Sequence, residues 1–362
     1  LPIKINHPKE IYKSTLTYST IDIHGFLSSD RLPILDVRSP GEYKHAHIPS
    51  AVSFPLFDDE ERAVIGTAYK QQSREKAIKI GLDYFGPKMR SLVEKAEDIC
   101  EKSEKGKSLI VHCWRGGMRS QAVAWLLNLY GFEVKLLTGG YKTFRQWANA
   151  QFVKEYNFHI LGGKTGSGKT VILHELNKKG QFFIDFEGLA SHKGSAFGNI
   201  GMPEQPSQEM FENMLALDLF HKSRSNPVIW VEDECQRIGN VNIPGDLYKT
   251  MGKSPVYFLE IPFEARLQYI LSEYGSLDKE RLINATLRIQ KRLGGLETKN
   301  AVNFLSEDKI SDAFDILLKY YDKFYMRSLD KKSGSNKQIS FVACENINFE
   351  ANAQKLLDFI SK

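Results

Sequence analysis

Cysteine is scarce in this chain, with four residues among 362, and no two of them are close enough to form a short Cys–Cys motif. The spacing argues against a disulfide framework and against a zinc site built on cysteines. We therefore predict no metal-ligand set of this kind and expect a reducing, cytoplasmic location. The four residues are Cys100, Cys113, Cys235 and Cys344.

Long hydrophobic runs are also missing. Apolar runs such as 108–111 and 227–231 have the length of a strand, far short of the ~20 residues of a membrane helix. The first four residues, Leu1-Pro2-Ile3-Lys4, lack the apolar core of a secretory signal. We therefore expect no membrane span and no membrane partner.

The charge balance has no strong excess of either sign. A net charge of +5 in 362 residues is only mildly basic, so it permits an anionic partner without requiring one. A solvated surface with a slight lysine excess accounts for the same number equally well. With 42% hydrophobic residues, the chain is typical of a globular protein long enough for two domains.

Strand and helix patterns alternate along the chain, which favours parallel sheets and an α/β class. We expect a first domain over 1–150 and a second over 151–362, the second ending in a helical extension. Short apolar strands are predicted at 33–38, 51–54, 109–112, 134–137, 158–161, 182–185, 228–231 and 256–261, with a basic loop at 327–337.

Cys113 carries the first chemical signature. It follows the predicted strand 109–112 and precedes Gly116, Gly117 and a predicted helix at 120–130. Successive backbone amides and a helix N-terminus would converge on its sulfur, and both lower a thiol pKa. Arg115 and Arg119 add positive charge, so we predict a catalytic cysteine assisted by these two arginines.

The length of this loop leaves a second interpretation open. Five residues separate Cys113 from Arg119, a spacing that also marks cysteine-dependent phosphatases. A wide ring of amides could hold a tetrahedral oxyanion beside the sulfur. Alternatively, Arg119 pairs with Asp36 or Glu42 and only braces the loop.

A complete phosphate-binding motif forms the second signature. Residues 163–170 read Gly-Lys-Thr-Gly-Ser-Gly-Lys-Thr, after a predicted strand and at the start of a helix. The glycines let the backbone wrap phosphates, while lysine supplies charge and the last threonine a hydroxyl that can bind Mg²⁺. The predicted binding residues are Gly163, Thr165, Gly166, Ser167, Gly168, Lys169 and Thr170.

Two further acidic positions lie at predicted strand ends. Asp233 belongs to the run Glu232-Asp233-Glu234 after the strand 228–231, and Asp185 ends the strand 182–185. We predict that both belong to the phosphate site, with Asp185 activating a hydroxyl or holding a metal-bound water. A strand-end carboxylate run can also be merely solvated.

The first domain resembles the rhodanese superfamily, whose members carry sulfur or selenium on a loop cysteine. The resemblance lies in Asp36-Val37-Arg38, Glu42-Tyr43, His47-Ile48-Pro49-Ser50-Ala51 and Gly139-Gly140-Tyr141. It covers roughly residues 15–150.

Rhodanese and phosphate-loop domains in this order resemble the tRNA 2-selenouridine synthase family. Further segments match that family, and they contain the remaining predicted binding residues, Ser195, Phe197, Arg237 and Arg292. The segments are Glu61 to Lys70, Glu187 to Gly198, Gln205 to Asn213, Glu232 to Gly239 and Lys291 to Gly295.

The resemblance implies a two-stage reaction on the wobble 2-thiouridine of tRNA. A geranyl group from geranyl diphosphate is first placed on the sulfur, and the geranylthio group is then exchanged for selenium from selenophosphate. Cys113 would carry or relay selenium. Because neither stage consumes ATP, we expect the phosphate loop to bind geranyl diphosphate, with no tightly bound cofactor.

Two interpretations are open for each of three groups of aromatic and basic residues. Phe197 and Phe211 would hold the prenyl tail, or pack in the core. Trp114 would stack on the flipped base, or pack. The loop 327–337 would contact phosphates of the tRNA, or be solvated.

Two other functions stay open on the motifs alone. One is a sulfurtransferase or cysteine phosphatase fused to a nucleotide-dependent kinase-like domain. The other is a nucleotide-switched binding protein with an inert rhodanese module, although such modules often lose the cysteine that is retained here.

Overall fold

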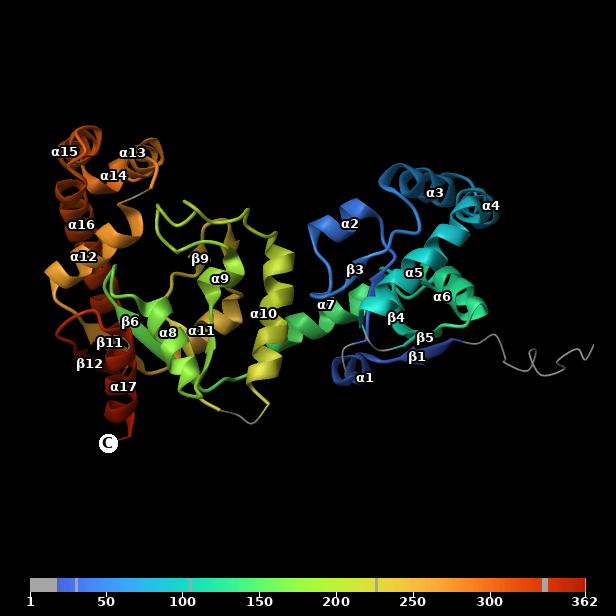
Figure 1. The fold of residues 1–362 in the computed structure, drawn as a ribbon, viewed down its shortest axis with the longest axis horizontal. Coiled ribbons are helices and arrows are strands. Elements are labelled where there is room, and N and C mark those ends of the chain that lie inside the picture. The colour runs from blue at the N-terminus through green and yellow to red at the C-terminus, as the bar shows by residue number, and fades with distance from the viewer. Residues whose placement is uncertain are drawn as a thin grey trace, which may run out of the picture. The chain divides into compact units, whose positions relative to one another are not determined.

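The structure is a computed structural model, and it describes residues 18–29, 32–103, 106–224, 227–275, 277–333 and 338–361. The chain divides into two compact units, residues 1–148 and 149–362. In Figure 1 the first unit runs from blue to green and the second from green to red. Each unit is described below by itself.

The first unit is built on a five-stranded sheet of order β1-β5-β4-β2-β3, in which every neighbouring pair is parallel. Parallel strands need crossover connections, and helices supply most of them. The strands are β1 (Ser19–Ile21), β2 (Ile34–Asp36), β3 (Val52–Ser53), β4 (Ser108–His112) and β5 (Glu133–Leu137). The helices are α1 (Ile23–Ser28), α2 (Pro40–His45), α3 (Asp59–Gln71), α4 (Arg74–Phe85), α5 (Met89–Ser103), α6 (Met118–Tyr130) and α7 (Gly140–Gln151), with a 3₁₀ turn at Gly86–Lys88.

The core of this unit lies where α5 and α6 pack on the sheet. Leu109 and Val111 of β4 are fully buried there, together with Val123 and Leu127 of α6. Because β4 is buried on both faces, it reads as a continuous apolar run rather than an alternating one. This placement carries Cys113 to the carboxyl edge of the sheet, where α6 begins.

The second unit also has a five-stranded parallel sheet, of order β12-β11-β6-β8-β7. Its strands are β6 (Phe158–Gly163), β7 (Phe182–Ile184), β8 (Ile229–Glu232), β11 (Val256–Glu260) and β12 (Ile339–Ala343). A separate antiparallel pair consists of β9 (Arg237–Ile238) and β10 (Val241–Asn242). The two sheets confirm the predicted α/β class with parallel strands.

Helices of the second unit form two apolar clusters. In one, α8 and α17 pack on the sheet through residues such as Leu173 and Leu356. In the other, α12, α13, α15 and α16 enclose Phe314 and Phe197. The helices are α8 (Lys169–Lys178), α9 (Phe186–Ala190), α10 (Gln208–Lys222), α11 (Gly245–Lys253), α12 (Phe263–Tyr274), α13 (Lys279–Arg288), α14 (Gln290–Leu293), α15 (Gly295–Ser306), α16 (Ile310–Ser333) and α17 (Phe349–Ile360).

One predicted loop is partly wrong. The basic loop expected at 327–337 is helical up to Ser333, where α16 ends, because the charged residues there continue a helix rather than break it. Residues 334–337 lie outside the described residues. The expected phosphate contacts of this segment therefore stay a prediction.

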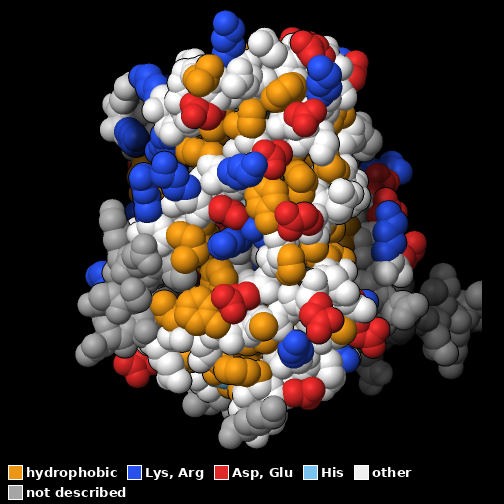
Figure 2. All heavy atoms as spheres, turned by 90° about the vertical axis from the view of Figure 1, so that its left-hand side faces the viewer, with side chains coloured by type: hydrophobic (Ala, Val, Ile, Leu, Met, Phe, Trp, Pro, Cys, Tyr) orange, Lys and Arg blue, Asp and Glu red, His pale blue; other side chains and the backbone are white. Residues whose placement is uncertain are grey.

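The face of the second unit made by its last helices and β12 has a mixed surface. Figure 2 shows Lys, Arg, Asp and Glu side chains interspersed with apolar ones on this face, without a continuous area of one sign. Among the helices that the structure describes, none is both long and apolar enough to cross a membrane.

Candidate active sites

The loop after β4 is held by the N-terminus of α7. The carbonyl of Cys113 accepts a hydrogen bond from the Tyr141 amide, and that of Trp114 accepts one from the Lys142 amide, both at 2.9 Å. Gly140 has φ of 59°, and a Cβ there would lie 2.3 Å from the Cys113 carbonyl oxygen. Only glycine fits this close approach. The Gly139-Gly140 turn therefore sets the position of the cysteine loop.

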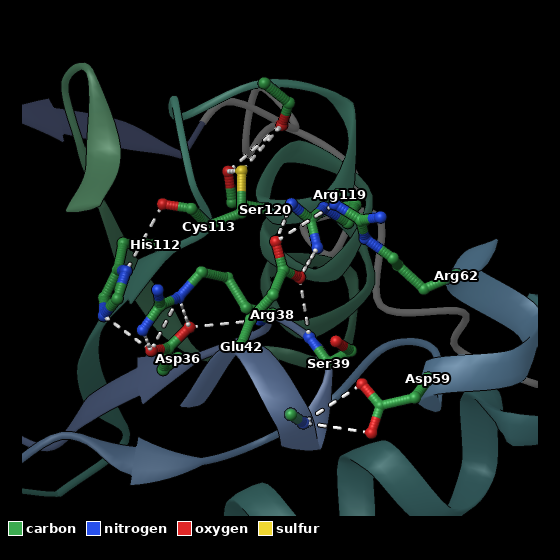
Figure 3. A network of polar contacts seen from close by, with 12 residues as sticks. Asp36, Arg38, Ser39, Glu42, Asp59, Arg62, His112, Cys113, Arg119 and Ser120 are labelled. Carbon is green, nitrogen blue, oxygen red and sulfur yellow. Dashed lines mark hydrogen bonds and ion pairs between the residues drawn. The ribbon is translucent and has the colours of Figure 1, made fainter. Parts of the chain in front are cut away.

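Ser120 is the polar side chain at the sulfur. Its hydroxyl lies 3.2 Å from Sγ of Cys113 and 3.0 Å from the Gly117 carbonyl. Both Cys113 and Ser120 are buried, and Figure 3 shows them side by side. A hydroxyl at this distance can donate to a thiolate. Sequence reasoning gave Ser120 no role, although its place in the first turn of α6 was a usable signal.

Asp36, Arg38 and His112 form a buried group of charged and titratable side chains. Arg38 makes a bidentate contact with Asp36, with its closest nitrogen 2.6 Å from Oδ2, and its guanidinium stacks 3.9 Å from the centre of the Tyr141 ring. His112 is fully buried next to Asp36, and burial lowers the pKa of this histidine, which favours its neutral form. Asp36 and Arg38 belong to the segments that resemble rhodaneses; both are buried, and Arg38 packs on the ring of Tyr141, whose amide donates to the Cys113 carbonyl.

Arg119 pairs with Glu42 of α2. Nη1 of Arg119 lies 2.6 Å from Oε2 of Glu42, and Arg62 contacts the other oxygen at 3.5 Å (Figure 3). Burial raises the pKa of Glu42, but the hydrogen bond and charge of Arg119 outweigh it and leave the pKa lowered. This is the bracing arrangement that the sequence analysis left open, and the predicted catalytic role of Arg119 stays a prediction.

Loss of this pair is expected to destabilise the first unit. Arg119→Ala and Glu42→Gln should each lower its free energy of unfolding by about 1–3 kcal/mol, because a partly buried charge-assisted contact disappears. Chemical denaturation of both variants measures this loss.

Titration with selenophosphate, the selenium donor that the family resemblance implies, separates bracing from catalysis. If that donor is used, a bracing role predicts that both variants keep the wild-type KM for it. If only Arg119→Ala raised that KM, the arginine would act on the oxyanion after all.

Two side chains of the cysteine loop face solvent. Arg115 is exposed, and the exposed fraction of Trp114 is 38% although its ring lies 5.5 Å from that of Tyr141. Both are therefore available to a substrate approaching Cys113. The roles predicted for them stay predictions.

The phosphate loop lies between β6 and α8, as its motif predicts. Nζ of Lys169 donates to the Gly163 carbonyl at 3.3 Å, and the Ser167 hydroxyl donates to the Lys164 carbonyl at 2.6 Å. Gly168, at the start of α8, has φ of 66°. The predicted residues 163–170 are thus one continuous turn from strand to helix, a geometry that directs amides toward an anion.

Three glutamates form a cluster, and two of them contact Thr170. Its hydroxyl lies 2.5 Å from Glu232 and 3.3 Å from Glu187, and Glu234 completes the group. One oxygen of each glutamate lies within 4.8 Å of the others. Burial, and then the neighbouring carboxylates, raise the pKa of Glu187 to about 9 and that of Glu234 to about 8.

These oxygens fit a hard divalent cation. Carboxylates and a threonine hydroxyl are the ligands that Mg²⁺ takes, and a cation would relieve the repulsion that raises the pKa values. Glu187, Glu232 and Thr170 would hold the ion, which supplies positive charge next to bound phosphates.

Mg²⁺ is expected to raise the melting temperature more at about pH 8.5 than at about pH 6. Because the pKa values of these two glutamates are raised from 4.5 to about 8 and 9, the folded protein binds more protons than the unfolded protein between these pH values. These carboxyls therefore stabilise the fold fully below pH 4.5 and lose that effect as the pH rises to about 9. A cation replaces the protons. Melting curves in Mg²⁺ are compared with curves in Na⁺ at equal ionic strength. Equal shifts of the melting temperature at the two pH values would contradict this prediction.

Two carboxylates predicted for the phosphate site, Asp185 and Asp233, make contacts with groups other than Thr170. Asp185 caps α9 by accepting from the Gly188 amide at 2.8 Å, so Glu187, two residues later, is the carboxylate at Thr170. Asp233 accepts from the Tyr325 hydroxyl at 2.7 Å, and the preceding Glu232 contacts Thr170 instead. The sequence predicted the acidic run 232–234, but it did not predict the direction in which each of its side chains points.

The two phenylalanines predicted for the prenyl tail are core residues. Phe211 is fully buried in α10, and Phe197 is 4% exposed and packs against Phe314 and Tyr274. Neither side chain has a free face, so the packing alternative describes them.

The other predicted binding residues in the family segments make local contacts. The Ser195 hydroxyl accepts from the Phe197 amide at 3.2 Å, and Nε of Arg237 donates to the Gly239 carbonyl at 2.9 Å. Arg292 is exposed on α14, near the ring of Phe324. The binding roles of Ser195, Arg237 and Arg292 stay predictions.

Comparison with known proteins agrees with both halves of the chain. Residues 22–146 match the rhodanese-like domain, and residues 156–346 match the tRNA 2-selenouridine synthase AAA domain. The tRNA 2-selenouridine synthase of Sulfurovum sp. strain NBC37-1 is 33% identical over 91% of this chain and 94% of its own.

Two further relatives carry the same name. The protein of Nitrosomonas europaea is 37% identical over 67% of this chain and 63% of its own. That of Pseudomonas putida strain W619 is 33% identical over 84% of this chain and 91% of its own. Since the similarity spans both units and the cysteine and phosphate loops within them, this chain belongs to the tRNA 2-selenouridine synthase family.

Proposed function

We propose that this protein is a transferase that converts the wobble 2-thiouridine of tRNA to 2-selenouridine through an S-geranyl intermediate. The observation that carries the proposal is the presence, on one chain, of a buried cysteine between β4 and the N-terminus of α6 and of a complete phosphate loop with a carboxylate cluster. Membership of the family gives these two sites a common substrate.

In the first stage the phosphate loop would bind geranyl diphosphate. The base sulfur attacks the first carbon of the geranyl group, the bond from this carbon to oxygen breaks, and diphosphate leaves. Lys169 and the loop amides would stabilise the negative charge that develops on the leaving group. The carboxylate cluster would hold Mg²⁺ next to the same diphosphate oxygens.

In the second stage selenium would replace the geranylthio group at C2 of the base. Alkylation makes that sulfur a better leaving group, so a selenium nucleophile can expel geranylthiol. The selenium of selenophosphate attacks C2, the bond from C2 to sulfur breaks, and water then cleaves the phosphorus–selenium bond and releases phosphate. Cys113 would relay the selenium by presenting selenophosphate to C2 and giving its thiol proton to the departing geranylthiolate, with Ser120 donating to the sulfur of Cys113 and Trp114 stacking on the base.

Nucleoside analysis tests this function. Purified protein is incubated with tRNA containing 2-thiouridine, first with geranyl diphosphate and then with selenophosphate. The expected products are S-geranyl-2-thiouridine after the first addition and 2-selenouridine after the second. A protein that instead hydrolysed nucleotides and left the tRNA unmodified would fit the kinase-like alternative.

A further inference from the structure

A tyrosine of the C-terminal helix α16 contacts the phosphate loop. The hydroxyl of Tyr325 donates to Oδ2 of Asp233 at 2.7 Å and accepts from the Gly163 amide at 3.4 Å. Its ring packs against Phe258 of β11. One hydroxyl thus joins the first residue of the loop to the carboxylate that follows β8.

A buried arginine makes a second connection between the same helix and the loop. Arg266 of α12 is 2% exposed, and its Nη1 donates to the Thr165 carbonyl at 3.0 Å. The same guanidinium makes a bidentate contact with Asp322, at 2.8 and 2.7 Å. Asp322 and Tyr325 are three residues apart and so lie on one face of α16.

Two loop glycines are packed against the same part of the chain. A Cβ on Gly166 would lie 2.8 Å from Ile270 of α12, and one on Gly168 would lie 2.3 Å from Phe349 of α17. The loop is therefore in contact with α12, α16 and α17 along its length. Fixing a backbone before the ligand arrives removes part of the ordering cost of binding.

Tyr325 remains a hydrogen-bond donor across the working pH range. Burial first, and then the charge of Asp233, raise the pKa of this phenol well above its ordinary value. The hydroxyl is consequently neutral, and its proton is directed at Asp233.

We propose that Tyr325 is a positioning residue for diphosphate binding, which fixes the first turn of the phosphate loop relative to the carboxylates after β8. The inference rests on the proposed function for the identity of the diphosphate, but not for the contact itself. It assigns to α16, far from the loop in sequence, a direct part in the first stage of the reaction.

Tyr325→Phe tests this, because it removes the hydroxyl and keeps the ring that packs on Phe258. Tyr320→Phe is the matched control, since Tyr320 lies on the same helix and its hydroxyl makes no hydrogen bond within the described part of the chain. We expect Tyr325→Phe to raise the Kd for inorganic pyrophosphate in Mg²⁺ and the KM for geranyl diphosphate by about fivefold to twentyfold. The kcat of geranylation, and selenation of pre-geranylated tRNA, should stay unchanged.

The outcomes distinguish the possible failures. A lower melting temperature with wild-type pyrophosphate affinity would overturn the positioning role and leave a structural one. Equal effects of Tyr325→Phe and Tyr320→Phe on that affinity would also overturn it. If pyrophosphate binding weakened in Tyr325→Phe while even the wild type transferred no geranyl group, the positioning role would stand and the proposed function would fall.

Discussion

Replacing Cys113 with serine is expected to abolish selenium incorporation while geranylation of the tRNA continues. A hydroxyl is far less acidic than a thiol and cannot supply the proton for the departing geranylthiolate in its place, and the neighbouring Ser120 hydroxyl, 3.2 Å away, is no more acidic. In the proposed function, the first stage uses the phosphate loop of the other unit. Nucleosides from treated tRNA should therefore contain S-geranyl-2-thiouridine and no 2-selenouridine.

Cys235→Ser is the control for this prediction. Cys235 is exposed and lies in the second unit, so its replacement should leave both products at wild-type levels. The proposed division of labour is wrong if Cys113→Ser fails to accumulate the geranylated base, or if it still forms 2-selenouridine.

Lys169→Ala is expected to impair geranylation strongly and selenation of pre-geranylated tRNA little. The ammonium group of Lys169 lies 3.3 Å from the carbonyl oxygen of Gly163, the first residue of the phosphate loop. Losing its charge-assisted contact should weaken diphosphate binding by ~1.5–3 kcal/mol, or about tenfold to a hundredfold. Steady-state kinetics of each stage, with geranyl diphosphate or selenophosphate varied, measure the effect.

Lys178→Ala provides the matched control. Lys178 lies at the other end of α8, pairs with Glu175 at the surface and is too far along the helix to touch the loop. Its replacement should change neither stage. Comparable losses in both stages for Lys169→Ala would argue against two separate sites.

Local pattern was enough to predict how both loops are built. An apolar run, then glycines, then a helical pattern specify a strand, a tight turn and a helix, because these depend on neighbouring residues. The strands β4 and β6 and the helices α6 and α8 accordingly lie where the sequence placed them. The acidic run after β8 was visible for the same reason.

Which side chains meet was decided by the tertiary structure. From the sequence, Arg119 had two possible partners near the cysteine loop, Asp36 and Glu42. Arg38 is buried together with Asp36 and pairs with that carboxylate. Arg119 pairs with Glu42 on α2. Charge alone cannot select among such pairs, because each is equally attractive until the backbone fixes the distances.

The sequence by itself thus determined the two loops, their order and the family of the chain. The tertiary structure decided that Glu232 rather than Asp233 contacts Thr170, that Phe197 and Phe211 are core residues, and that Tyr325 reaches Gly163. The physical reason is that adjacent residues of a strand point to opposite faces, and that parallel crossovers bring together residues more than a hundred positions apart. A local sequence pattern indicates neither the face to which a side chain points nor its neighbour across the sheet.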